Sequence, residues 1–321
     1  MIPLVAFLLT FCTLVVLLRS NLANYALDAP NSRSLHTKAI PRTGGLALVL
    51  GVLVSLFLLG GMWVWIALLS ALMSVSLADD FVNLPVHLRF TIQLAVSALF
   101  VYFLTPQSVW WLAFLAVIAL VWMTNLYNFM DGSDGLAGGM AVFGFGTYAV
   151  AAYLAGHTQI AMLNGAIMFS SVAFLFFNFH PAKIFMGDSG SIPLGFLAGA
   201  VGIYGAQANL WPLWFPLLVF SPFIVDATVT LIKRAIRHEK VWQAHREHYY
   251  QRLVQLGWGH KKTAIVEYVL MLSVSVSALF ALKLTNVGVA FILLFWGFVY
   301  PLLMFLVDKK WKHRQPQTSY K

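Results

Sequence analysis

The stretch NLYNFMDGSDGLAGG, residues 125–139, places carboxylates, amides and glycines between two hydrophobic runs that are each long enough to cross a bilayer. Carboxylate oxygens such as those of Asp131 and Asp134 are ligands that magnesium prefers, and substrate phosphates often complete its shell. The glycines would let the backbone turn sharply and approach a ligand. The two aspartates would share one face if the segment began a helix. The residue types therefore indicate a divalent cation and a phosphate-bearing ligand, although the spacing alone does not assign the ligands.

Acidic and amide side chains also occur at the ends of other hydrophobic runs. Asp79 and Asp80 follow one run, and FNFHPAKIFMGDSGS contains Asn178, Lys183 and Asp188. Carboxylates at this depth are costly to desolvate unless they are paired, metal-bound or open to water. A single aspartate of this kind is equally well explained as a solvated charge or a helix cap. Five aspartates on one membrane face favour a functional site.

A later segment, KRAIRHEKVWQAHREHYYQR, adds cationic hydrogen-bond donors. His245 and His248 are three residues apart, and Arg252 follows a turn later, so a helix would present all three along one side. Zinc is one alternative, but no third ligand with suitable spacing accompanies the histidines. A solvated amphipathic helix is another. We favour contacts with an anionic substrate.

Helices that span a membrane must position these residues, because 60% of the 321 residues are hydrophobic and only 10% are charged. Apolar runs repeatedly approach the roughly 20 residues that a spanning helix needs. The sequence therefore predicts an all-α polytopic membrane protein, with one domain over residues 1–321 and a retained first helix. The predicted spans number eleven, at 1–18, 44–59, 62–78, 90–104, 109–124, 138–155, 159–177, 191–207, 211–232, 264–282 and 286–307.

Basic residues predict the orientation of these spans, because lysine and arginine are retained on the cytoplasmic side. Of the 20 Lys and Arg residues, only Lys283 falls on the opposite face from the others. The N-terminus is therefore expected outside and the C-terminus in the cytoplasm. The net charge of +9 is attributed to topology and to membrane lipids, and nucleic acid is not an expected partner.

Four segments together resemble the polyprenyl-phosphate N-acetylhexosamine-1-phosphate transferases: PNSRSLHTKAIPRTGG, DD at 79–80 with LPVHLRF, NLYNFMDGSDGLAGG and FNFHPAKIFMGDSGS. The resemblance covers most of the chain. It implies transfer from a UDP-N-acetylhexosamine to undecaprenyl phosphate in the bacterial inner membrane, with UMP released on the cytoplasmic side. It also implies Mg²⁺ as cofactor, with Mn²⁺ as an alternative. A homodimer is compatible with the sequence.

By this resemblance, Asp188 would hold the magnesium ion, and Asp79 and Asp80 would lie beside the metal and the attacking phosphate, with Asp80 as a further metal ligand. Asn178 would support the same site. The remaining assignments are to substrate binding: Asn125, Asn128, Asp131 and Asp134 on the nucleotide side, the basic residues Arg33, His36, Arg42 and Lys183, and His245, Arg246 and His248 for the donor.

The histidine segment departs from the family pattern, because HREH replaces the tight histidine cluster that many relatives have. This departure favours the subgroup that serves O-antigen and similar surface glycans, with donors that include N-acetylfucosamine and N-acetylquinovosamine. The muramyl-pentapeptide transferase of peptidoglycan synthesis is the alternative within the family. A transporter is the alternative of another class, and it would need charges near the bilayer midplane. Asp226 lies inside a predicted span.

Overall fold

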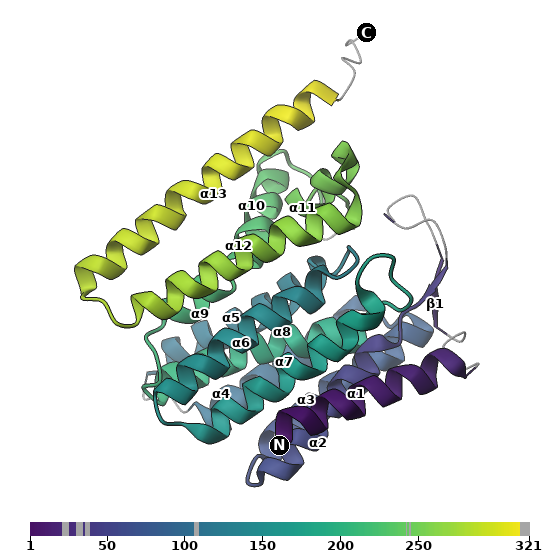
Figure 1. The fold of residues 1–321 in the computed structure, drawn as a ribbon, viewed down its shortest axis with the longest axis vertical. Coiled ribbons are helices and arrows are strands. Elements are labelled where there is room, and N and C mark those ends of the chain that lie inside the picture. The colour runs from purple at the N-terminus through teal and green to yellow at the C-terminus, as the bar shows by residue number, and fades with distance from the viewer. Residues whose placement is uncertain are drawn as a thin grey trace.

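The computed structural model confirms an all-α protein (Figure 1). In the described part of the chain, the only strands form a small antiparallel ribbon of β1 (Leu27–Asp28) and β2 (Ile40–Pro41), with Leu27 opposite Pro41. The structure describes residues 1–20, 26–29, 35, 39–105, 109–241, 243 and 245–314.

The helices follow the predicted hydrophobic runs closely. Among the described residues, nine helices are long and apolar enough to cross a membrane, and α2 is a shorter apolar helix. The first eight are α1 (Ile2–Arg19), α2 (Gly44–Leu59), α3 (Trp63–Val82), α4 (Val86–Leu104), α5 (Trp110–Phe129), α6 (Leu136–Leu154), α7 (Thr158–Asn178) and α8 (Asp188–Gln207). The rest are α9 (Trp214–Val219), α10 (Ser221–Ile236), α11 (Tyr249–Leu253), the π-helical turn η2 (Val254–Trp258), α12 (Gly259–Ala281) and α13 (Asn286–Arg314).

The predicted span 211–232 is not one continuous helix. The chain forms two helices, α9 and α10, that meet at Phe220. Pro222 lies in the first turn of α10, where its missing N–H and fixed φ are tolerated at a helix start but would interrupt a helix interior. The number of membrane crossings and their orientation remain predictions.

Close contacts between small residues fix α8 in the middle of the bundle, where 78% of its 18-residue apolar stretch is buried. A Cβ atom on Gly45 of α2 would lie 2.2 Å from the backbone nitrogen of Gly190. A Cβ atom on Gly195 would similarly lie 2.7 Å from the Cβ atom of Tyr127 of α5. Small residues allow membrane helices to approach this closely. The beginning of α8, with Asp188, is thereby held between α2, α3 and α5.

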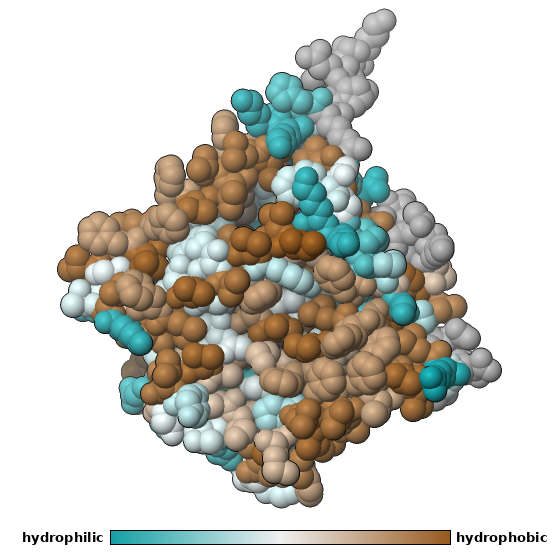
Figure 2. All heavy atoms as spheres, in the orientation of Figure 1, coloured by the Kyte–Doolittle hydropathy of each residue, from teal (hydrophilic) through white to brown (hydrophobic). Residues whose placement is uncertain are grey.

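The last helix, α13, lies along the edge of the bundle (Figure 1), and only 11% of its 18-residue apolar stretch is buried. Figure 2 shows hydrophobic residues over much of this face and hydrophilic residues around the C-terminal end of α13. This distribution is typical of helices whose sides face lipid and whose ends face water.

Candidate active site

The last residues of α3, α5 and α7, the loop before α6 and the start of α8 surround a polar pocket of about 170 Å³. The pocket lies at the end of the bundle that carries the polar segments identified in the sequence. Seven of the predicted site residues line it: Arg42, Asp80, Asn128, Asp131, Asp134, Asn178 and Asp188.

Asp80 lies in the last turn of α3 and is only 2% exposed. Its carboxylate accepts the backbone N–H groups of Asp188 at 3.1 Å and Ser189 at 3.0 Å. These are otherwise unpaired donors at the positive end of the α8 dipole, where a carboxylate is favourable. Arg42 Nη2 donates to the backbone carbonyl of Asp80 at 2.5 Å. Asp80 therefore both lines the pocket and fixes the first turn of α8.

Arg89 of α4 connects two of the predicted catalytic aspartates. Its Nη1 atom lies 2.6 Å from Asp79 Oδ2 and 3.1 Å from Asp188 Oδ2. Asp79 also accepts the backbone N–H of Leu84 at 2.6 Å. Arg89 was not assigned to the site from the sequence, although it belongs to the LPVHLRF segment that follows Asp79 and Asp80.

Asp131 is half-buried at the pocket wall and has no ion-pair partner among the described residues. Burial, and then the negative charges of Asp188 and Asp80, raise the pKa of Asp131 well above its ordinary value. Each carboxylate therefore makes ionisation of the next one costlier. A bound cation would offset this repulsion.

Asp131 and Asp134 lie in the loop before α6, so the expectation that a helix would present them on one face was wrong. The helix begins at Leu136, after Gly135 with φ of 77°. This left-handed conformation suits glycine and interrupts the helix on its N-terminal side. Gly139 has a different role from the turn predicted for it, because it lies inside α6 where a Cβ atom would be 2.0 Å from the Tyr268 ring.

Two histidines that were not predicted from the sequence hold the loop before α6. His180 Nδ1 lies 2.6 Å from Asp134 Oδ2, and the His180 ring stacks on His260 with centroids 5.5 Å apart. His260 Nδ1 lies 2.9 Å from Ser133 Oγ and accepts the backbone N–H of Asp134 at 3.3 Å. With Nδ1 as an acceptor, the proton is assigned to Nε2, which donates to the Leu35 carbonyl at 3.2 Å.

Asn178 connects the loop before α6 with the loop between α7 and α8. Its Oδ1 atom accepts the Gly135 N–H at 2.9 Å, and its Nδ2 atom donates to the Ile184 carbonyl at 2.9 Å. Asn125 does not line the pocket; its Nδ2 atom donates to Gln93 at 2.7 Å. Lys183 is exposed and does not line the pocket. Two predicted substrate contacts, Arg33 and His36, lie outside the described residues.

His245 and His248 do not share a helix face with Arg252 as predicted, because α11 begins only at Tyr249. His248 is buried, and its ring stacks between Phe129 and Tyr250 with centroid distances of 6.4 and 5.9 Å. His245, Arg246 and His248 do not line the acidic pocket. His248 reaches the end of α5 through its contact with Phe129.

The buried Asp226 of α10 is a helix cap. Its two carboxylate oxygens accept the backbone N–H groups of Tyr249 at 2.8 Å and Tyr250 at 3.0 Å, which begin α11. The Tyr250 hydroxyl in turn donates to the Phe129 carbonyl at 3.1 Å. Asp226 thus holds α11 against the loop that carries Asp131.

The carboxylates fit a magnesium ion whose shell is completed by substrate. In the described part of the chain, no group of three or more His, Cys, Asp or Glu residues is arranged to hold a metal by itself. Magnesium commonly uses only one or two protein carboxylates together with substrate phosphates. Asp80, Asp131 and Asp188 line one pocket and repel one another, so they offer such a partial shell.

Comparisons with known proteins agree with this arrangement. Residues 62–206, which include α3 to α8 and most of the pocket, match the model of glycosyl transferase family 4. The chain is 30% identical, over 96% of its length and 94% of the relative's, to a probable undecaprenyl-phosphate N-acetylglucosaminyl 1-phosphate transferase of Bacillus subtilis. It is 26% identical, over 76% of its length and 72% of the relative's, to a decaprenyl-phosphate N-acetylglucosaminephosphotransferase of Mycobacterium tuberculosis.

A phospho-N-acetylmuramoyl-pentapeptide-transferase of Koribacter versatilis is 33% identical over 54% of this chain and 48% of its own length. The match to the Bacillus subtilis protein extends over nearly the whole of both chains, and the family model covers the helices that form the acidic pocket. The chain is therefore a member of glycosyl transferase family 4, a membrane-embedded phosphosugar transferase.

Proposed function

We propose that this protein transfers N-acetylhexosamine 1-phosphate from a UDP-N-acetylhexosamine to undecaprenyl phosphate. The observation that carries the proposal is the convergence of Asp80, Asp131 and Asp188 with Arg42 in one pocket at the end of a membrane bundle. A carboxylate-rich pocket suits a metal-bound diphosphate, and its position suits an acceptor whose phosphate lies at the membrane surface. The curated relatives act, by their names, on polyprenyl phosphates and N-acetylglucosamine phosphate.

The reaction exchanges one phosphoanhydride for another. An oxygen of the lipid phosphate attacks the β-phosphorus of the UDP-sugar, and the bond from that phosphorus to UMP breaks. The lipid phosphate is already largely ionised near neutral pH, so removal of a proton is a small part of the task. Positioning and charge stabilisation are the larger part.

Mg²⁺, or Mn²⁺ in its place, would neutralise the diphosphate and the charge that develops on UMP. We assign Asp188 and Asp80 to hold the ion. Both Asp80 oxygens already accept N–H groups of α8, which limits the lone pairs that Asp80 can offer. Asp131, which lacks an ion-pair partner among the described residues, is the additional carboxylate best placed to share this role.

Basic and polar residues around the carboxylates would hold the two substrates. Arg42 lines the pocket, so we assign its guanidinium group to phosphate oxygens of the substrates. Arg89 does not line the pocket, and we assign it to holding Asp79 and Asp188. We assign the nucleotide side to Asn128 and Asp134, with Asn178 as the support of their loop. The donor role of His245, Arg246 and His248 stays a proposal that requires the segment between α10 and α11 to contact the sugar.

We further propose a neutral N-acetylhexosamine donor, including 6-deoxy sugars, and a place in O-antigen or related surface-glycan synthesis in the bacterial inner membrane, with the site facing the cytoplasm. The sequence HREH and the nearly full-length match to an N-acetylglucosaminyl 1-phosphate transferase support this choice. The partial matches to pentapeptide transferases make the muramyl-pentapeptide donor the second candidate.

The test is release of UMP by the purified protein in detergent with undecaprenyl phosphate and a panel of UDP-sugars. UDP-N-acetylglucosamine, 6-deoxy N-acetylhexosamine donors and UDP-N-acetylmuramyl pentapeptide should be compared with and without Mg²⁺. We expect metal-dependent UMP release with a neutral N-acetylhexosamine donor. Efficient turnover of the pentapeptide donor alone would reassign the substrate, and an inactive panel would reject the reaction in favour of a transporter.

A further inference from the structure

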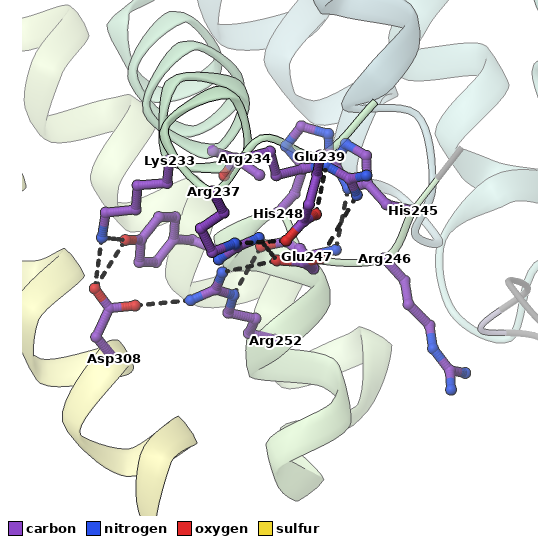
Figure 3. A network of polar contacts seen from close by, with 12 residues as sticks. Lys233, Arg234, Arg237, Glu239, His245, Arg246, Glu247, His248, Arg252 and Asp308 are labelled. Carbon is purple, nitrogen blue, oxygen red and sulfur yellow. Dashed lines mark hydrogen bonds and ion pairs between the residues drawn. The ribbon is translucent and has the colours of Figure 1, made fainter. Parts of the chain in front are cut away.

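A second polar cavity, of about 830 Å³, lies between the end of α10, the start of α11 and the end of α13. It shares no lining residue with the acidic pocket. Figure 3 shows much of its polar network from close by. The cationic side chains that line it are Lys233, Arg237, Arg246, Arg252 and Lys312.

Three acids hold part of this network in place and leave it cationic. Asp308 of α13 lies 2.6 Å from Lys233 Nζ and 2.7 Å from Arg252 Nη1. Arg237 pairs with Glu239 at 2.6 Å and with Glu247 at 2.5 Å. Lysine and arginine present several donors each, so these contacts fix the side chains without using all their N–H groups.

Two further cations on the cavity wall have no ion-pair partner among the described residues. Arg246 is exposed and points away from the network in Figure 3. Lys312 is exposed on the last turns of α13. The cavity is therefore preorganised on one side and has uncompensated positive charge on the other. Such a wall suits a phosphate group, which accepts hydrogen bonds from several cations at once.

The cavity lies where apolar helix surfaces give way to charge. On α13, Phe305 is 64% exposed one turn before Asp308, and Trp311 follows on the cavity wall. On α10, Ile232 and Ile236 are 52% and 72% exposed beside Lys233. Tryptophan and long cationic side chains commonly mark the level of lipid headgroups, with apolar surface below them. A ligand here would meet cations at its head and hydrocarbon surface at its tail.

We propose that this cavity binds the phosphate headgroup of an anionic glycerophospholipid. A free phosphate would use the cations but leave the exposed apolar surfaces of α10 and α13 without a partner, and a neutral lipid would leave the excess positive charge uncompensated. The cavity is also coupled to the catalytic end of the bundle. Arg252 belongs to α11, whose Tyr250 hydroxyl contacts the Phe129 carbonyl beside the acidic pocket. A bound headgroup would therefore stabilise the position of α11.

The test compares two double variants that lose the same charge from the same region. Arg246→Gln with Lys312→Gln removes the two unpaired cavity cations, and Lys309→Gln with Lys310→Gln removes two exposed lysines that do not line the cavity. Binding of short-chain phosphatidylglycerol to the detergent-solubilised full chain would be measured by native mass spectrometry, with phosphatidylcholine of equal chain length as the neutral probe. Thermal unfolding without lipid checks that all variants fold alike.

We expect phosphatidylglycerol to bind the wild-type protein more tightly than phosphatidylcholine. Loss of two cation–phosphate contacts should weaken its binding about tenfold in the cavity variant, but less than about twofold in the control variant. Equal losses in both variants would show unspecific surface attraction and overturn the proposal. So would equal binding of both lipids, displacement of the lipid by millimolar inorganic phosphate, or its displacement by a short polyprenyl phosphate, which would make the cavity an acceptor site.

Discussion

Replacement of Asp188 by Asn tests the electrostatic role of the acidic pocket. The change keeps the size of the side chain and removes one formal charge from the group formed with Asp80 and Asp131. If Asp188 holds the metal, turnover should fall at least about a hundredfold, a loss of roughly 2.7 kcal/mol of transition-state stabilisation. The effect on folding should be much smaller, because Arg89 keeps its 2.6 Å contact with Asp79 when the 3.1 Å contact with Asp188 weakens.

UMP release at saturating donor and acceptor measures this loss, and a magnesium titration at each substrate concentration separates weaker metal binding from slower chemistry. Glu239→Gln is the matched control, because it removes a carboxylate from the same end of the bundle but outside the acidic pocket. Turnover of the control should stay within about twofold of wild type, as expected for an exposed ion pair. An Asp188→Asn protein with wild-type turnover and unchanged magnesium dependence would refute the assignment.

Three further outcomes are expected. Asp226→Ala removes the charged acceptor of two backbone N–H groups, so thermal unfolding in detergent should show a loss of about 2–4 kcal/mol, and an unchanged melting curve would show that the cap is dispensable. Burial and, after it, the charges of His248 and Arg234 lower the pKa of His245 to about 4. As pH falls from about 6.5 towards 4, the unfolded chain therefore binds the extra proton first, and the stability of the folded protein should decline. His245→Gln should flatten this decline, and equal slopes in the variant and the wild type would contradict the lowered pKa of His245. Single cysteines, introduced after replacement of Cys12, should be labelled from outside at position 107 and only from inside at position 240, and the reverse pattern would reject the orientation.

Hydropathy was sufficient to predict most of the fold, because a spanning helix needs one long apolar run that is visible in the sequence. The break between α9 and α10 was missed because the residues around Phe220 stay apolar while Pro222 starts a new helix. The loop before α6 was misjudged for a related reason: the positive φ of Gly135 is a backbone property that composition does not reveal.

The site was predicted where the residues lie in a recognisable segment and missed where the contact depends on the fold. Asp80 and Asp188 could be proposed from their neighbours along the chain, but His260 reaches Ser133 across 127 positions. The only local signal for His260 was a histidine beside two lysines at the start of a predicted span. Asp226 was ambiguous in the sequence, because an acid inside a span is consistent with an ion path, with a wall of the cleft or with helix packing.

The close contact between Gly45 and Gly190 has a consequence for how the molecule can change shape. With backbones this near, α2 and α8 cannot slide past one another without a steric clash, and α8 is held from the opposite side through Gly195 and Tyr127. The carboxylate of Asp188, at the start of α8, is thus held in a fixed position relative to α2 and α5. Any motion that admits a substrate and releases a product must therefore come from the parts around α8, and not from sliding of α2 against α8.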